Sequence, residues 1–281
     1  MSGNLTKTKR RIASVTSTQK ITKAMGMIAS VKTKRNKDLF DASSLSSKKC
    51  FSICSYLFSA CRKSPYFIKE NEGDKCLYIV ITSDLGLCGG YNSNLFRHFD
   101  PIYKQDDELI VFGNKGKSHY HKEKGFNHSP LLDDPSLDIS LKELTAFASK
   151  LLEAYKDKKY SSIKLVHTRY LNSLSFLPTI TTILPMEVIK DESNPNALPP
   201  LVEPTPEELL NQIIPLVIGY QLKEGLDESK LAEQSSRRNA MDAANDNADE
   251  LLNNLKIEYN KARQTSITQE IVEVVSGSVN A

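Results

Sequence analysis

The sequence predicts an α/β protein in which a long antiparallel two-helix coiled coil, formed by both termini, carries an inserted Rossmann-like α/β domain. All 12 prolines of the 281 residues lie between Pro65 and Pro215. Because proline removes a backbone donor and clashes with the preceding turn, the proline-free stretches 1–64 and 216–281 favour long helices. A heptad pattern near the C-terminus and a strand–helix alternation in the middle complete the prediction.

The heptad pattern indicates what the long helices bury. Apolar residues recur near the C-terminus at alternating spacings of three and four, which is typical of a coiled-coil seam. These residues are Met241, Ala244, Ala248, Leu251, Leu255, Tyr259 and Ala262. Near the N-terminus Ile21, Met25 and Ile28 share one face, with Ile12 and Val15 on a neighbouring face. A second copy of the chain could supply the partner helix, but the insert favours pairing within one chain.

The start of the C-terminal helix has a clear signal. Thr205 is a good cap, Pro206 suits the first helical position, and Glu208 can reach back to the cap. Pro215 then predicts a bend in the first part of the helix. We therefore expect three domains: an N-terminal coiled-coil helix (1–65), a central α/β domain (66–204) and a C-terminal coiled-coil helix (205–281).

The middle of the chain alternates between strand and helix patterns. Apolar, β-branched runs predict strands at 76–82, 108–112, 163–170 and 176–184. Helical patterns include Leu95 and Phe96 after the first strand, and Leu141, Leu144, Phe147 and Leu151 after the second. This alternation is typical of a small α/β domain. Residues 191–204, rich in proline and asparagine, are the expected return linker.

Charge and composition exclude several classes of protein. The net charge is only +3, but residues 1–40 are strongly basic. The basic residues there are Lys7, Lys9, Arg10, Arg11, Lys20, Lys23, Lys32, Lys34, Arg35 and Lys37. No aromatic residues interleave with them, so we expect no nucleic-acid binding. No apolar run approaches the roughly twenty residues needed to span a bilayer, so we expect no direct membrane insertion.

No motif for catalysis or cofactor binding stands out. Gly86, Gly89 and Gly90 follow a strand, but their spacing does not fit a dinucleotide fingerprint. The sequence from Gly116 to Ser118 imitates the end of a phosphate-binding loop without its first glycine. His119, His121 and His128 are expected to be solvated residues of a polar loop, and the five cysteines lack metal-ligand spacing. We expect no cofactor, no metal and no catalytic residues.

Three motifs carry a family resemblance. They are RRIASVTSTQKITKAM at 10–25, SDLGLCGGYNSNLF at 83–96 and EYNKARQTSITQEIVEVVSG at 258–277. In their order and in their distances from the chain ends they resemble the gamma subunits of F-type ATP synthases. The resemblance implies a non-catalytic central shaft that turns inside a hexamer of alpha and beta subunits. It also implies an epsilon-type subunit and a membrane ring as further partners.

The resemblance also assigns roles to particular residues. Arg263, Gln264, Thr268 and Glu270 match family positions where the upper C-terminal helix meets the beta subunits. Met25 and Arg237 match positions near the lever region of the beta subunits. The family pattern begins close to Met1, which implies no organelle leader. The expected location is therefore the bacterial cytoplasm, peripheral at the inner face of the cell membrane.

Departures from the family pattern leave alternatives open. Leu85 replaces a usual arginine, Gly26 a charged or polar residue, and Arg238 a usual methionine. Residues 199–204 read PPLVEP where relatives have an aromatic-rich stretch near the membrane ring. A first alternative is the shaft of an F-type-like ATPase paralogue that drives other mechanical work without a proton-driven ring. A remote alternative is a coiled-coil adaptor unconnected to an ATPase, and the working direction, synthesis or hydrolysis, stays open.

Overall fold

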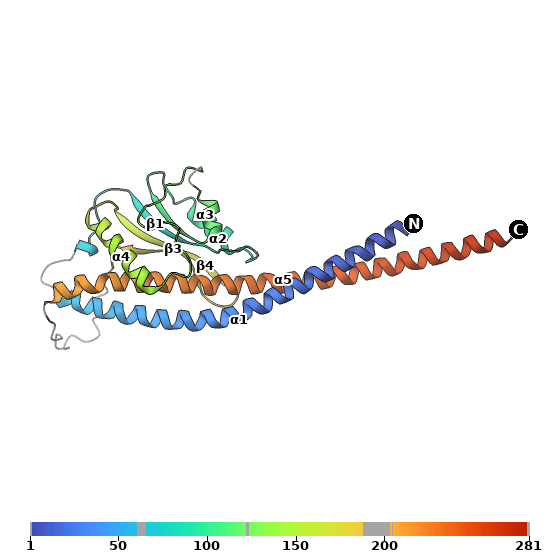
Figure 1. The fold of residues 1–281 in the computed structure, drawn as a ribbon, viewed down its shortest axis with the longest axis horizontal. Helices are drawn as coiled ribbons and strands as arrows, with labels where there is room; N and C mark the ends of the chain where they lie inside the picture. The colour runs from blue at the N-terminus through green and yellow to red at the C-terminus, as the bar shows by residue number, and fades with distance from the viewer. Residues whose placement is uncertain (1, 61–65, 122–123, 188–202, 204, 280–281) are drawn as a thin grey trace. The chain divides into compact units, whose positions relative to one another are not determined.

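Figure 1 shows the fold in a computed structural model, which describes residues 2–60, 66–121, 124–187, 203 and 205–279. Two long helices, α1 (Ser2–Ala60) and α5 (Pro206–Val279), come from the two ends of the chain. Between them lie η1 (Tyr66–Ile68), β1 (Cys76–Ile81), α2 (Tyr91–Phe99), β2 (Glu108–Phe112), α3 (Asn114–His119), α4 (Leu141–Lys156), β3 (Ser162–Tyr170) and β4 (Phe176–Leu184). The predicted α/β class with long terminal helices is confirmed.

The chain forms two compact units, and each contains parts of both long helices. Residues 1–30 and 237–281 form one unit from α1 and α5 alone, which we call the helix-pair unit. Residues 31–236 form the other, which we call the sheet unit. The sheet unit contains all the strands, the shorter helices and the remaining segments of α1 and α5.

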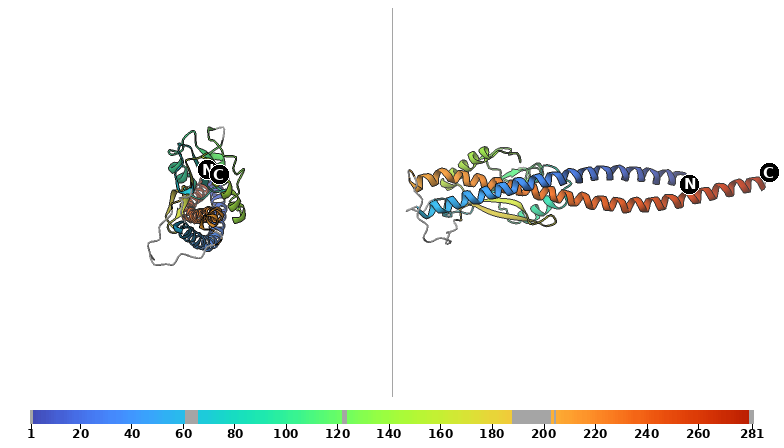
Figure 2. Two further views of the ribbon diagram at one scale, coloured as in Figure 1. Left: turned by 90° about the vertical axis from the view of Figure 1, so that its left-hand side faces the viewer. Right: turned by 90° about the horizontal axis from the view of Figure 1, so that it is seen from below.

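In the helix-pair unit α1 and α5 run antiparallel (Figure 2). The Thr22 hydroxyl donates to Asn245 Oδ1 at 2.5 Å, and the Gln19 amide donates to the Asn245 carbonyl at 3.5 Å. Further along α1, a Cβ added to Gly26 would lie 3.4 Å from the Cβ of Met241. Higher residue numbers on α1 thus meet lower numbers on α5. The predicted pairing of the two helices within one chain is confirmed.

The face that α1 buries differs from the predicted one. Ile21 and Ile28 are 59% and 57% exposed, and Met25 is half-buried. The buried positions at this level are Gly26 and Ala29. The prediction that Ile21 and Ile28 share the buried face with Met25 was therefore wrong for the two isoleucines. Small side chains at the contact let two helices approach closely, and here that contact outweighs the burial of isoleucine.

On α5 the predicted seam is confirmed except at one position. The buried or half-buried members are Met241, Ala244, Ala248, Leu255, Tyr259 and Ala262. Leu251 is 40% exposed, and its neighbour Leu252 is buried instead. Successive residues of a helix point about 100° apart, so a shift of one position moves the side chain off the seam.

The predicted start of α5 is confirmed. The backbone N–H of Glu208 donates to the Thr205 hydroxyl at 3.3 Å, and Pro206 is the first helical residue. The helix continues through Pro215. The expected return linker, 191–204, lies outside the described residues except for Glu203.

The sheet has four strands in the order β2-β1-β3-β4. β1 pairs in parallel with β2 and β3, whereas β4 runs antiparallel to β3. All four predicted strands are confirmed within one residue at each end. The parallel strands connected through helices give the sheet unit its Rossmann-like character.

Each face of the sheet has its own hydrophobic core. On β1, Leu77, Ile79 and Ile81 belong to a core with α4 and α5, while Tyr78 and Val80 belong to a core with α2. This alternation follows from the two-residue period of a strand. The sheet is thus covered by helices on both faces, which explains why its central strands are apolar throughout.

Two glycines let α5 approach the rest of the sheet unit. A Cβ added to Gly219 would lie 2.9 Å from the Thr145 hydroxyl of α4. A Cβ added to Gly225 would lie 2.5 Å from Leu165 of β3. Leu222, on the same segment of α5, is 2% exposed. The first part of α5 is therefore a core helix of the sheet unit, a role that the sequence analysis did not predict.

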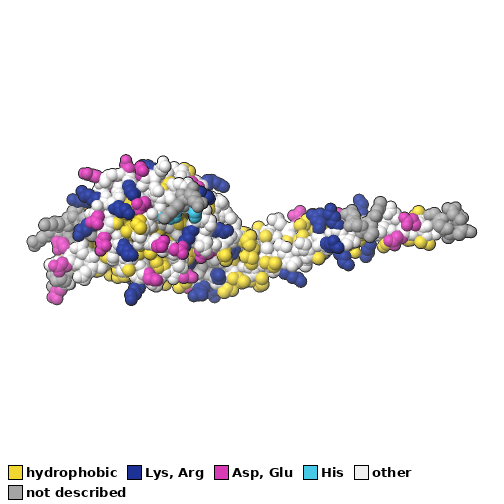
Figure 3. Space-filling model, turned by 45° about the horizontal axis from the view of Figure 1, so that its top comes forward, with side chains coloured by type: hydrophobic (Ala, Val, Ile, Leu, Met, Phe, Trp, Pro, Cys, Tyr) yellow, Lys and Arg dark blue, Asp and Glu magenta, His cyan; other side chains and the backbone are white. Residues whose placement is uncertain are grey.

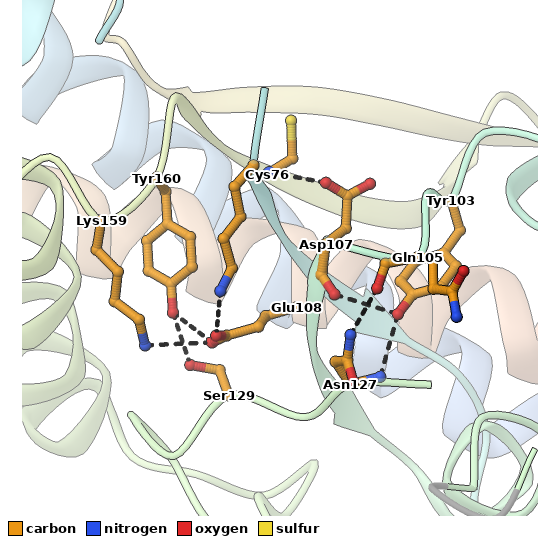
Figure 4. A network of polar contacts seen from close by, with 10 residues as sticks. Cys76, Tyr103, Gln105, Asp107, Glu108, Asn127, Ser129, Lys159 and Tyr160 are labelled. Atoms are coloured by element: carbon orange, nitrogen blue, oxygen red, sulfur yellow. Dashed lines mark hydrogen bonds and ion pairs between the residues drawn. The ribbon is translucent and has the colours of Figure 1, made fainter. Parts of the chain in front are cut away.

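A polar network at the start of β2 joins three segments of the sheet unit (Figure 4). The Glu108 carboxylate accepts hydrogen bonds from Tyr160 at 2.6 Å and Lys75 at 2.7 Å, with Lys159 at 3.3 Å. The Ser129 hydroxyl lies 3.0 Å from that of Tyr160. Burial alone would raise the pKa of Glu108, but these hydrogen bonds and the charge of Lys159 outweigh it and lower the pKa to about 2.

Glu108→Gln is expected to lower the free energy of unfolding at neutral pH by about 1–3 kcal/mol, because hydrogen bonds to a charged acceptor become weaker neutral ones. In the wild-type protein the pKa of Glu108 falls from 4.5 to about 2 on folding. Its contribution is therefore complete above the unfolded-state value and is lost as the pH falls toward the folded-state value. Urea unfolding across this acid range measures the loss. Glu153→Gln, at an exposed position of α4, is the control, and identical acid profiles for wild type and Glu108→Gln would contradict the prediction.

Candidate functional site

Four of the residues expected to meet the beta subunits lie in the last turns of α5. Arg263, Gln264, Thr268 and Glu270 are all exposed. The Thr268 hydroxyl donates to the Gln264 carbonyl at 2.9 Å, and the Ser266 hydroxyl donates to Glu270 at 3.4 Å. Within the described part of the chain, no side chain pairs with the Arg263 guanidinium. Its five donors therefore face outward, as recognition of a carboxylate or carbonyl on another chain requires.

Met25 and Arg237 lie elsewhere in the helix-pair unit. Met25 is half-buried on α1, and Arg237 is 7% exposed on α5. Arg237 precedes Arg263 by 26 positions of one continuous helix, which corresponds to about 40 Å at 1.5 Å per residue. The structure therefore does not bring the six expected coupling residues together as a single site.

The end of α5 also presents an apolar surface that the sequence analysis missed. α5 extends past the start of α1, and every side chain from 267 to 275 is exposed (Figure 1). Ile267, Ile271 and Val274 are 47%, 58% and 72% exposed and lie on one face of the helix. Their spacing of four and three residues could have been read from the sequence. Exposed apolar stripes of this kind mark contact surfaces for other chains.

The basic residues of α1 in the helix-pair unit, from Lys7 to Lys23, form a second exposed surface. All ten lysines and arginines of residues 1–40 identified above are exposed. In the helix-pair unit, Lys and Arg side chains gather on the paired helices (Figure 3). Clustered positive charge attracts acidic surfaces and accelerates their association. This surface therefore fits a negatively charged partner.

The two glycine-containing turns serve the packing of the sheet unit. Gly89 has a φ of 58°, which favours glycine, and precedes α2 by two residues. Gly116 is buried, and its N–H donates to the Thr82 hydroxyl at 2.9 Å. The Lys117 ammonium pairs with Asp134 at 2.5 Å. The N–H of Gly116 and the ammonium of Lys117 thus bind other parts of the same chain.

The prediction that the histidines are solvated loop residues was wrong for His119. His119 is the last residue of α3, stacks on Phe96 with ring centroids 3.9 Å apart, and lies 3.0 Å from an Asp100 carboxylate oxygen. His128 lies 2.6 Å from the Tyr120 carbonyl. The misjudged segment is α3, which has only six residues and no apolar periodicity to predict it.

The described residues show neither a metal cluster nor a membrane span. No three histidine, cysteine, aspartate or glutamate side chains there gather in a way that could hold a metal ion. None of the helices in the described segments has a stretch long and apolar enough to cross a membrane.

Paired terminal helices with an exposed apolar end, a basic flank and an attached α/β unit define a stalk-type subunit that works through contacts with other chains. Residues 4–280 match the family model described as ATP synthase. The ATP synthase gamma chain of Clostridium kluyveri is 37% identical over 273 residues, covering 96% of this chain and 95% of that protein. The gamma chain of Mycoplasma mobile is 39% identical over 287 residues, covering 98% of each. The chain belongs to the ATP synthase gamma-chain family.

Solved structures show the same fold. A chain of the Euglena gracilis mitochondrial ATP synthase, in its OSCP/F1/c-ring structure, superposes with a TM-score of 0.67 at 16% identity, covering 99% of this chain and 95% of that chain. A chain of the Tetrahymena thermophila mitochondrial ATP synthase central stalk and c-ring superposes with a TM-score of 0.57 at 24% identity, covering 80% and 99%.

Proposed function

We propose that the chain is the central rotary shaft of an F-type ATP synthase or ATPase, and that it couples rotation to conformational change in the catalytic beta subunits. Its membership of the gamma-chain family supports this function. The observation that carries it is the exposed end of α5, where apolar residues lie beside the outward-facing Arg263. In this role the chain itself performs no chemistry. It transmits free energy to the catalytic sites of the beta subunits through contacts that differ between their conformations.

We further propose that alpha and beta subunits surround the helix-pair unit. The basic surface of α1 then faces acidic groups of these subunits, and Arg263, Gln264, Thr268 and Glu270 contact one beta subunit at a time. Met25 and Arg237 contact the beta subunits at a lower level of the shaft. A charged, outward-facing group can gain and lose a partner during rotation without disturbing the fold of the shaft itself.

An epsilon-type subunit and a membrane ring complete the proposed set of partners. The central stalk and c-ring named for the Tetrahymena assembly support a ring partner. Residues 199–204, whose sequence departs from the family pattern, lie outside the described residues apart from Glu203. The proposed location is the bacterial cytoplasm, at the inner face of the cell membrane.

The apolar end of α5 provides the test of this function. Ile271→Asp combined with Val274→Asp is expected to weaken retention of the chain in the alpha–beta complex by about tenfold or more, because a buried, unpaired carboxylate costs several kcal/mol. The isolated chain should keep its free energy of unfolding within about 0.5 kcal/mol, since both side chains are exposed there. Size-exclusion chromatography of the tagged complex at decreasing concentration measures retention.

Glu273→Gln is the control, because Glu273 is an exposed residue of the same helical turn and lies outside the apolar face. It should leave retention unchanged. Failure of alpha and beta homologues to co-purify with the wild-type chain would contradict the proposed function. Full retention of the double-aspartate variant would instead show that the apolar end of α5 is not part of the interface.

A further inference from the structure

The sheet unit contains a cavity of about 740 Å³ that the proposed function does not use. It lies between the part of α1 that belongs to this unit, the β3–β4 hairpin and the first part of α5. Small-molecule sites typically have volumes of about 300–1,000 Å³. The cavity is therefore large enough for a metabolite.

Serine hydroxyls with unused hydrogen-bonding capacity line the α1 wall. Ser44, Ser47 and Ser55 line the cavity and are 9%, 4% and 9% exposed. Their neighbours Ser43 and Ser46 donate to backbone carbonyls three and four residues earlier, at 3.1 and 2.9 Å, as helical serines commonly do. In the described part of the chain the three cavity serines have no such partner. Hydroxyls that line a cavity and bond to no other part of the protein are free to donate to and accept from a ligand.

The opposite wall also has polar atoms without partners. His167 of β3 is 5% exposed, and its Nε2 lies 3.2 Å from a carboxylate oxygen of Glu228. The other ring nitrogen of His167 and Oε1 of Gln221 are buried without a hydrogen-bond partner among the described residues. Both residues line the cavity. Residues with unused polar groups are thus found on all three elements that line the cavity, α1, β3 and α5.

The charges around the cavity balance one another. Lys48 and Arg169 contribute two positive charges, and Glu224 and Glu228 contribute two negative charges. A site built for a phosphate would carry an excess of positive charge, and a site for a polyamine an excess of negative charge. Apart from these balanced charges, the polar groups that line the cavity are hydroxyls and an amide, which hydrogen-bond well to uncharged partners.

We propose that this cavity binds a neutral, polyhydroxylated small molecule, such as a sugar or a cyclic polyol. Each ligand hydroxyl can both donate and accept hydrogen bonds, and so can the hydroxyls of Ser44 and Ser47. Phe40 and Phe51 supply apolar surface for the C–H face of a ring. A bound molecule would join α1 to β3 and α5 within the sheet unit. A bound molecule would stabilise the folded state by an amount that rises with the logarithm of its concentration above the Kd.

Isothermal titration of the purified full chain with glucose and with myo-inositol tests the proposal. We expect saturable, millimolar or tighter binding of at least one of them. Ser44→Ala combined with Ser47→Ala is expected to weaken it by about tenfold, because two hydrogen bonds are lost. Ser46→Ala is the matched control, since this hydroxyl is bonded to its own helix, and should leave affinity unchanged.

Two further measurements test the proposal even if the double alanine variant folds poorly. Ser47→Leu, which replaces the hydroxyl with aliphatic carbon atoms inside the cavity, should weaken binding at least as much as the double alanine variant. In the wild-type chain the bound sugar should slow hydrogen exchange in β4 and in residues 40–55. The proposal is overturned if neither sugar binds saturably, if Ser47→Leu binds as tightly as wild type, or if inorganic phosphate or spermidine competes for the cavity.

Discussion

Gly113→Ala is expected to destabilise the sheet unit by about 4 kcal/mol or more. Gly113 follows β2 with a φ of 91°, and an added Cβ would lie 2.3 Å from the Thr82 carbonyl oxygen. The N–H of Thr82 donates to the Phe112 carbonyl at 2.9 Å, so Thr82 cannot move away without disturbing the pairing of β1 with β2. Urea unfolding followed by circular dichroism measures the loss.

Gly125→Ala is the matched control for this prediction. Gly125 has nearly the same φ, 88°, but no atom of the described residues lies within 4 Å of an added Cβ. Its replacement should cost only the conformational penalty of about 1–2 kcal/mol. An equal loss of stability in both variants would show that backbone conformation, and not the contact with Thr82, makes Gly113 necessary.

Arg263→Ala combined with Gln264→Ala is expected to slow ATP turnover of the assembled complex by tenfold or more. Hydrogen bonds to a charged group contribute about 1.5–3 kcal/mol, and a loss of that size in one rotary state raises the barrier accordingly. Both side chains are exposed, so the isolated chain should keep its stability. Steady-state ATPase assays on complexes of verified composition measure the effect.

Lys256→Ala is the control, because Lys256 is an exposed basic residue of the same helix that lies two turns before Arg263. It should leave turnover within twofold of wild type. If the double variant also turns over at the wild-type rate, the two residues are ordinary surface, and steric pushing by α5 is sufficient to drive the beta subunits.

Much of the local structure was predictable because its causes lie within a few residues. Thr205 and Pro206 start α5 through a cap and a fixed φ, which depend on no distant contact. The strands were predictable because both of their faces are buried and their sequences are apolar throughout. The proposed coupling residues were assigned only through the family resemblance, since an exposed arginine such as Arg263 has no periodic or spacing signal of its own.

By itself the sequence determined the two long helices, the four strands, their order along the chain and the family. Only the tertiary structure decided which face α1 buries and that the first part of α5 is a core helix of the sheet unit. Gly26 and Ala29 displaced Ile21 and Ile28 from the helix contact, and Gly225 brought α5 onto β3. The physical reason is that helix and strand formation depend mainly on neighbouring residues, whereas the choice of a buried face depends on the size and shape of side chains that lie two hundred positions away in the sequence.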